Sequence, residues 1–138
     1  DIDNTLVPHG APADKRAKEL FGRLESIGFA TCLISNNQEP RVKMFNEEIG
    51  TRYIFNARKP ARKNYIRAME MMETDRTNTI FVGDQLFTDV WGAKRAGIRN
   101  ILVKPMYPKE EIQIVLKRYL ERIVLYFYKR KQRITHEE

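Results

Sequence analysis

Cysteine and histidine are almost absent from this chain. Cys32 is the single cysteine among 138 residues, and the two histidines are His9 and His136. One thiol cannot form an intrachain disulfide or supply the paired thiolates of a metal site, and neither histidine has a partner at metal-ligand spacing. The composition therefore excludes a disulfide scaffold and favours a reducing compartment.

Long apolar runs are also missing. The longest uninterrupted apolar or aromatic stretch, residues 123–128, has six residues, whereas a helix needs about 20 to span a bilayer. The sequence opens on Asp1 without a methionine or a signal-peptide pattern,. We expect a cytoplasmic protein with a single domain over residues 1–138, whose first strand is missing before Asp1.

The charge is unbalanced in favour of basic residues. Lys and Arg number 25 against 18 Asp and Glu, a net charge of +7 in a chain with the 42% hydrophobic share of a globular protein,. The excess is concentrated in residues 104–138, which hold nine basic and five acidic residues. This balance favours an anionic partner: nucleic acid, anionic lipid or a phosphorylated substrate.

Helical and strand patterns alternate along the chain. Short apolar runs at 29–34, 53–55, 79–82 and 98–103 are typical of buried parallel strands, and apolar residues at helical spacing lie before and between them,. Pro60 is expected to open the third helix. The alternation predicts an α/β fold, a Rossmann-like three-layer sandwich with a mostly parallel sheet.

A long basic amphipathic helix is expected over residues 108–131. Its predicted apolar face consists of Ile112, Val115, Leu116, Tyr119, Ile123 and Phe127. Such a face can simply pack on the domain, or part of the helix can lie on an anionic membrane. Both interpretations stay open. If the helix lies on a membrane, the cytoplasmic protein would be located peripherally at the inner membrane surface.

Polar residues directly follow the apolar strand runs. In open parallel sheets, ligands bind at the carboxyl ends of strands. Carboxylates, a hydroxyl and an ammonium at one such edge are the groups needed to hold one divalent cation and one phosphate. The residues concerned are Asp1, Asp3, Thr5, Ser35, Asn36, Lys59, Asp84 and Asp89.

The order and spacing of these residues resemble the motifs of haloacid-dehalogenase (HAD)-type phosphatases. The matching segments are Asp-Ile-Asp-Asn-Thr at 1–5, Ser35, Lys59, and Gly-Asp through Thr-Asp at 83–89. More narrowly, the first motif, Ser-Asn-Asn at 35–37 and the last motif are similar to the subclass IIIA, YqeG-like group, which is related to mitochondrial phosphatidylglycerophosphatases. The resemblance covers residues 1 to about 103 and implies a phosphomonoester hydrolase that requires Mg²⁺.

The resemblance implies a role for each carboxylate. Asp1 is the nucleophile that forms an aspartyl-phosphate, and Asp3 is the general acid and then the general base. The Mg²⁺ ion is held by the Asp1 side chain, the Asp3 backbone carbonyl and Asp84. Asp89 orients a metal-bound water or the lysine.

The resemblance also implies which residues hold the phosphate. Ser35 hydrogen-bonds a phosphate oxygen and Lys59 neutralises phosphate charge, while Thr5 and Asn36 complete the substrate-binding set. Each motif alone has an ordinary structural explanation, because Asp, Ser and Thr also cap turns and helices. The four motifs in order favour the catalytic interpretation.

No segment between the motifs has room for a cap domain. Residues 6–18 precede the first helix, and residues 35–59 are filled by one helix and one strand. An uncapped site suits a bulky phosphomonoester, such as phosphatidylglycerophosphate at a membrane surface. The alternatives are a nucleic-acid-end phosphatase, a non-hydrolytic receiver-like module and a nucleic-acid-binding module, and nucleic acid ranks lower as a partner because no known binding motif is found.

Overall fold

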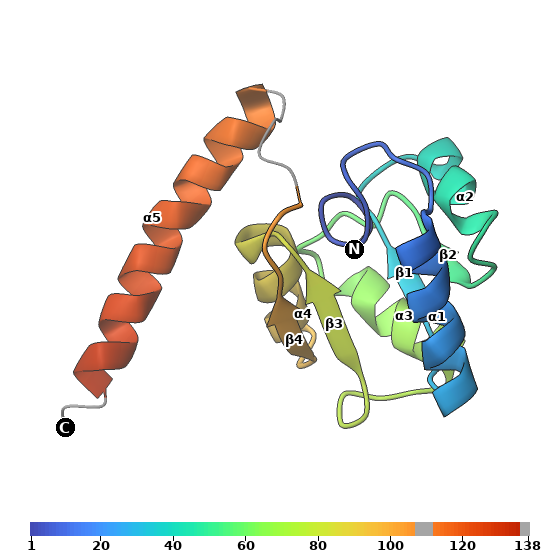
Figure 1. The fold of residues 1–138 in the computed structure, drawn as a ribbon. Coiled ribbons are helices and arrows are strands. Elements are labelled where there is room, and N and C mark those ends of the chain that lie inside the picture. Colours follow the sequence, from blue (N-terminus) through green and yellow to red (C-terminus); the bar gives the residue numbers. More distant parts are fainter. Residues whose placement is uncertain (107–111, 136–138) are drawn as a thin grey trace.

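The structure is a computed structural model that describes residues 1–106 and 112–135, with side chains in the last helix described from residue 118 to residue 129. Figure 1 shows the course of the chain. The elements in order are α1 (Lys15–Ile27), β1 (Cys32–Ile34), α2 (Glu39–Asn46), β2 (Arg52–Ile54), α3 (Lys63–Met72), β3 (Ile80–Gly83), η1 (Leu86–Val90), α4 (Trp91–Arg95), β4 (Arg99–Leu102) and α5 (Ile112–Thr135).

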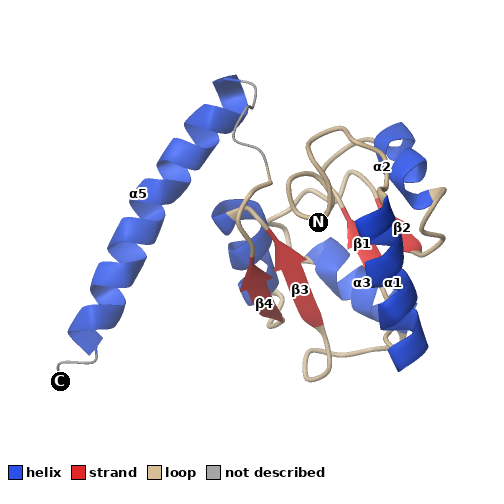
Figure 2. Ribbon diagram, in the orientation of Figure 1, coloured by secondary structure: helices blue, strands red, loops and turns tan. Residues whose placement is uncertain are grey.

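The strands form two parallel pairs, β1 with β2 and β3 with β4 (Figure 2). The first residues of the chain lie between the pairs. The amino nitrogen of Asp1 donates to the Val82 carbonyl of β3 at 3.1 Å, and Ile2 packs in the same core cluster as Leu33 of β1. The segment 1–5 therefore lies beside the ends of both β1 and β3. The expected strand before Asp1 concerns residues outside the sequence and stays a prediction.

Helices cover both faces of the β1–β2 pair. Leu33 packs with Ala17 of α1 and Phe45 of α2, whereas Ile34 packs with Tyr65 of α3 in a second core cluster. Successive residues of a strand point to opposite faces of its sheet, so the two clusters lie on opposite sides of β1. The predicted α/β fold with parallel strands between helices is confirmed.

Local signals set the ends of α1, but the expected start of α3 was wrong. The Asp14 side chain accepts a hydrogen bond from the Ala17 amide at 2.8 Å, and Gly28 ends the helix with a φ of 99°,. Pro60 does not open α3, which begins at Lys63. Residues 58–61 instead form a turn closed by the Ala61 amide and the Arg58 carbonyl at 2.9 Å.

The last helix is present, and three residues of its expected apolar face are exposed. Tyr119, Ile123 and Phe127 are 61%, 43% and 60% exposed. The helix contacts η1 and α4, with Glu121 on the Phe87 amide and Tyr128 on Lys94. Packing of the expected apolar face on the domain is thus not seen at these three residues, and contact with a membrane stays a prediction.

Part of the expected helix and part of its expected apolar face cannot be placed in the structure. Residues 108–111 of the expected helix lie outside the described residues, as do the side chains of Ile112, Val115 and Leu116. Within residues 1–106 and 112–135, every helix is too short or too polar to cross a membrane.

Candidate active site

A buried lysine lies at the centre of the predicted site. The Lys59 Nζ donates to Asp1 Oδ1 at 2.9 Å and to Asp89 Oδ1 at 2.6 Å. Lys59 is 6% exposed and Asp89 is 1% exposed. Burial of a charge is costly unless an opposite charge compensates it, and here the ammonium and the carboxylates compensate one another. The fold thus brings together three residues from three of the predicted motifs.

Asn36 positions the lysine through its backbone. The Asn36 Oδ1 accepts a hydrogen bond from the Lys59 amide at 2.7 Å, and the Asn36 Nδ2 donates to the Lys59 carbonyl at 3.1 Å. Both amide contacts cross from the end of β1 to the turn before α3. In this structure the Asn36 side chain, which was predicted to bind substrate, contacts Lys59.

Ser35 is the last residue before that loop and is buried. Its Oγ accepts a hydrogen bond from the Asn37 amide at 3.1 Å. This contact fixes the loop at the end of β1, next to the Lys59 backbone. A hydroxyl that accepts such a bond still has its own proton to donate, so the predicted role of Ser35 toward a phosphate oxygen stays a prediction.

Thr5 links the carboxylates of Asp1 and Asp84. Its Oγ1 lies 2.9 Å from Asp1 Oδ2 and 3.1 Å from Asp84 Oδ1. One hydroxyl proton serves one of these acceptors at a time. Burial raises the pKa of Asp84, opposed by its hydrogen bond and charge contact with Arg118, while the charge of Asp89 raises it further. The substrate-binding role predicted for Thr5 stays a prediction, and its hydroxyl contacts carboxylates here.

Three carboxylates could hold a metal ion. Asp1, Asp84 and Asp89 each offer an oxygen atom, and these atoms lie within 4.8 Å of one another. Hard divalent cations such as Mg²⁺ prefer oxygen ligands of this kind. The donor set therefore fits a divalent cation, and it places the Asp89 carboxylate beside the two predicted carboxylate ligands.

Gly83 makes room for the Asp89 side chain. A Cβ atom at Gly83 would lie 2.6 Å from the Asp89 Cβ. The π-helical turn η1 carries Asp89 back toward the end of β3, where its Oδ2 accepts a hydrogen bond from the Gln85 amide at 3.1 Å. The glycine of the Gly-Asp motif is thus explained by close packing inside the site.

The Asp3 carboxylate lies apart from this cluster. Its Oδ1 accepts from the Gly10 amide at 2.7 Å and from Arg41 Nη2 at 2.8 Å, and its Oδ2 accepts from Asn37 Nδ2 at 2.7 Å. Burial alone would raise the pKa of Asp3, but the hydrogen bonds from Arg41 and Gly10 outweigh burial and hold this pKa below its ordinary value,. The carboxylate of Asp3 therefore stays ionised near neutral pH.

Asn37, Arg41 and Arg118 donate side-chain hydrogen bonds to predicted site residues and were missed from the sequence. Asn37 and Arg41 hold Asp3, and Arg118 of α5 donates to Asp84. Asn37 adjoins the Ser-Asn pair and fits an ordinary turn equally well. Arg41 shares α2 with one other basic residue, Lys43, and Arg118 lies among many on α5, and no local pattern distinguishes either. Their roles depend on which helix face meets the site.

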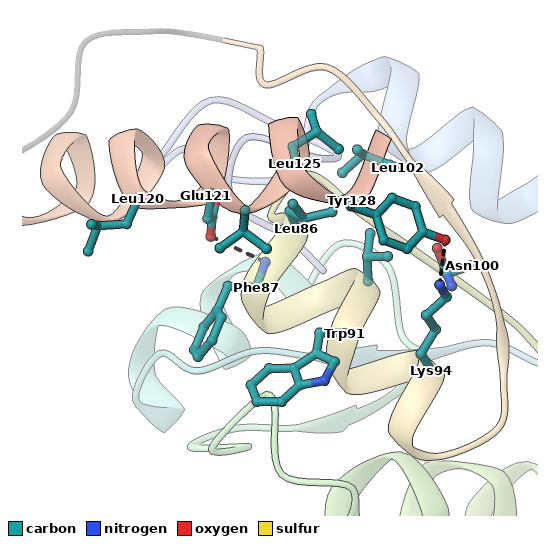
Figure 3. A pocket seen from close by; sticks show the side chains of 12 residues that line it. Leu86, Phe87, Trp91, Lys94, Asn100, Leu102, Leu120, Glu121, Leu125 and Tyr128 are labelled. Carbon is teal, nitrogen blue, oxygen red and sulfur yellow. Dashed lines mark hydrogen bonds between the residues drawn. The ribbon is translucent and has the colours of Figure 1, made fainter. Parts of the chain in front are cut away.

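A largely apolar cavity of about 700 Å³ adjoins the site between α5 and the η1–α4 segment (Figure 3). It begins at Leu86, two residues after Asp84, and at Glu121, one turn of α5 after Arg118. The Glu121 Oε1 accepts from the Phe87 amide at 3.4 Å, and the Lys94 Nζ donates to the Tyr128 hydroxyl at 2.7 Å. Further lining residues are Val90, Trp91, Asn100, Leu102, Leu120, Val124 and Leu125.

Comparisons with known proteins agree with this geometry. The family model described as HAD-hydrolase-like matches residues 56–105. Over 139 aligned positions the chain is 40% identical to "Probable phosphatase YqeG" of Bacillus subtilis (strain 168), and the match covers 100% of this chain and 81% of that protein. The crystal structure of an uncharacterized protein from Listeria monocytogenes serotype 4b is similar in fold, with a TM-score of 0.61 and 19% identity over 80% of this chain and 81% of that one.

The parallel α/β fold and the cluster around Lys59 define the class of HAD-like hydrolases. Within that class, the 40% identity over the whole chain shows that this protein belongs to the HAD-superfamily phosphatases of the YqeG type. It is therefore a phosphatase, as predicted. The family generally uses a divalent metal, for which the carboxylates of Asp1, Asp84 and Asp89 are suited.

Proposed function

We propose that the enzyme hydrolyses phosphomonoesters with Mg²⁺ through an aspartyl-phosphate on Asp1, and that its substrate is a lipid phosphomonoester such as phosphatidylglycerophosphate. The observation that carries the mechanism is the environment of Asp1. Its two carboxylate oxygens are held by Lys59 and Thr5, each at 2.9 Å, beside Asp84 and Asp89. A carboxylate fixed in this way is oriented for attack on a phosphorus atom.

In the first step an oxygen of Asp1 attacks phosphorus and the bond from phosphorus to the ester oxygen breaks. The ammonium of Lys59 offsets the negative charge that the phosphate brings to the carboxylates. Lys59 and Arg118 only partly neutralise the carboxylates of Asp1, Asp84 and Asp89. Bound Mg²⁺ would add positive charge there. In the second step water attacks phosphorus, which releases inorganic phosphate and restores the Asp1 carboxylate.

Asp3 supplies the proton transfers in this proposal. It protonates the leaving ester oxygen and then accepts a proton from the attacking water. Its contact with Arg41 and its lowered pKa favour the ionised form, which suits the second transfer. For the first transfer the carboxyl must be protonated, which the Arg41 contact opposes.

The apolar cavity supports a lipid substrate. Leu86, Phe87 and Trp91 line it together with Leu120 and Leu125 of α5 (Figure 3), and Leu86 follows Asp84 by two residues. Acyl chains attached to a phosphate in the site would fill this apolar space, whereas a nucleotide chain would leave it unused. The basic and aromatic residues exposed on α5 would at the same time contact an anionic membrane,.

A phosphate-release assay with and without Mg²⁺ tests the mechanism. We expect Asp1→Asn to abolish turnover while the domain stays folded, because the substitution removes the nucleophile and keeps its volume. Asp14→Asn is the matched control, because asparagine caps α1 as well as aspartate does,. Retention of most activity in Asp1→Asn, or failure of the parent to form a beryllofluoride adduct at Asp1, contradicts the mechanism.

The same assay tests the substrate. Phosphatidylglycerophosphate in detergent micelles is compared with small sugar phosphates and with oligonucleotides that carry a terminal phosphate. We expect the highest kcat/KM for the lipid, and Leu86→Asp at the cavity wall should lower that value with little change for a sugar phosphate. A preference for the sugar phosphates or the oligonucleotides refutes the lipid proposal and leaves the phosphatase assignment intact.

A further inference from the structure

Helix α5 brings a second cation to the carboxylate cluster. The Arg118 Nη2 lies 2.5 Å from Asp84 Oδ2, and the Arg118 side chain is 19% exposed while that of Asp84 is fully buried. The neighbouring turn of the helix is fixed by the contact of Glu121 with the Phe87 amide. Arg118 is thus held at the edge of the site from outside the four sequence motifs.

The charges of the site show what this arginine contributes. Three carboxylates (Asp1, Asp84 and Asp89) face two cations (Lys59 and Arg118), which leaves one negative formal charge. A bound divalent cation would turn this into one positive charge, which attracts a phosphate dianion. Without Arg118 the loaded site would be neutral, so the arginine decides whether it attracts the substrate.

The two other cations that contact predicted site carboxylates, Lys59 and Arg41, are more deeply buried than Arg118. Lys59 is 3% exposed at its side chain and holds both Asp1 and Asp89. Arg41 pairs with Asp3. A guanidinium has five N–H donors in a planar fork that matches phosphate oxygens, so it can contact a carboxylate and a phosphate together.

We propose that Arg118 binds the phosphate group of the substrate, so that α5 completes the active site. The inference rests on the proposed phosphatase chemistry and adds one substrate-binding residue to it. It also gives α5 a function besides any membrane contact, because displacement of the helix would remove a phosphate ligand. The contact with Asp84 is then the position in which the side chain is held before the phosphate arrives.

Calorimetric titration of the full chain with inorganic phosphate, in saturating Mg²⁺, tests the proposal without turnover. We expect Arg118→Gln to weaken phosphate binding roughly 10- to 100-fold, the range for loss of a charge-assisted contact. Arg118→Lys should fall between parent and Arg118→Gln, because it keeps the charge and loses the fork. Arg23→Gln, at an exposed arginine of α1, is the control and should bind phosphate like the parent.

Steady-state kinetics and metal titration complete the test. Arg118→Gln should raise KM for the phosphomonoester, while its Mg²⁺ affinity, measured by titration with the metal alone, changes less than about threefold. Parent-like phosphate affinity in a folded Arg118→Gln or Arg118→Lys variant overturns the proposal. A loss of Mg²⁺ affinity as large as the loss of phosphate affinity also overturns it, since the arginine would then act on Asp84 alone.

The two proposals can fail separately. A parent that hydrolyses phosphomonoesters, with unchanged phosphate binding in Arg118→Gln, refutes the role of Arg118 only. A parent that binds phosphate through Arg118 and shows no Mg²⁺-dependent hydrolysis refutes the proposed chemistry only.

Discussion

Replacement of Lys59 by methionine should cost a substantial part of a typical margin of stability. The substitution keeps the length of the side chain and removes the ammonium that contacts Asp89 at 2.6 Å and Asp1 at 2.9 Å. Asp89 is 1% exposed, so its carboxylate would stay buried without this cation. Breaking a buried pair by removing one partner costs about 3–5 kcal/mol, against the roughly 5–15 kcal/mol that stabilises a domain.

Urea unfolding followed by circular dichroism measures this loss. EDTA is added so that no divalent cation compensates the carboxylates. The expected loss corresponds to a fall in Tm of roughly 10–15 °C for a chain of this size. Lys63→Met, at the exposed first residue of α3, is the matched control and should change the free energy of unfolding by less than about 0.5 kcal/mol.

A second substitution separates the ion pair from general packing effects. In Lys59→Met/Asp89→Asn the buried negative charge is removed as well, so the double variant should be more stable than Lys59→Met alone. A double-mutant cycle made of Lys59→Met, Asp89→Asn and the double variant gives the interaction energy of the pair, which should be at least about 2 kcal/mol. The reasoning is refuted if Lys59→Met costs less than about 1 kcal/mol, or if the double variant is no more stable than the single one.

Three further predictions concern the surroundings of the site. Because the folded-state pKa of Asp3 is lowered, the stabilisation that its carboxylate contributes is present at neutral pH and is lost as pH falls through that pKa,. Arg41→Gln should cost about 1–3 kcal/mol at pH 7 and move this loss of stability to higher pH. Identical urea midpoints of the variant and the parent from pH 3 to 7 would contradict this prediction. Gly83→Ala should cost about 1–3 kcal/mol in thermal unfolding because its Cβ would meet Asp89,, whereas the control Gly22→Ala in α1, where nothing lies within 4 Å of the new Cβ, should stabilise by a few tenths to about 1 kcal/mol. Neutralisation of the C-terminal cations (Lys129→Gln, Arg130→Gln and Lys131→Gln) should weaken co-sedimentation with anionic vesicles about fivefold per charge at low salt, and parent-like co-sedimentation of this variant would refute membrane contact by that segment.

The cluster of carboxylates around Lys59 was partly predictable from the sequence because a general property of parallel sheets brings such residues together. Polar residues that follow buried strands meet at the carboxyl edge of a sheet. Asp84 follows this rule at the end of β3, and the fold brings it together with Asp1, Lys59 and Asp89. The alternation of helices and strands is likewise set locally, by apolar spacing and by residues such as Gly28 that end a helix,.

Only the tertiary structure decided which other side chains reach this edge. The sequence predicts a helix over residues 108–131, but not that Glu121 and Tyr128 of α5 contact η1 and α4. In this placement Phe127 is exposed and Arg118 contacts Asp84. Arg41 of α2 likewise contacts Asp3, from which it is 38 positions away in the sequence. Such contacts join residues far apart in the chain, so they follow from the relative placement of packed elements, which local patterns of sequence do not contain.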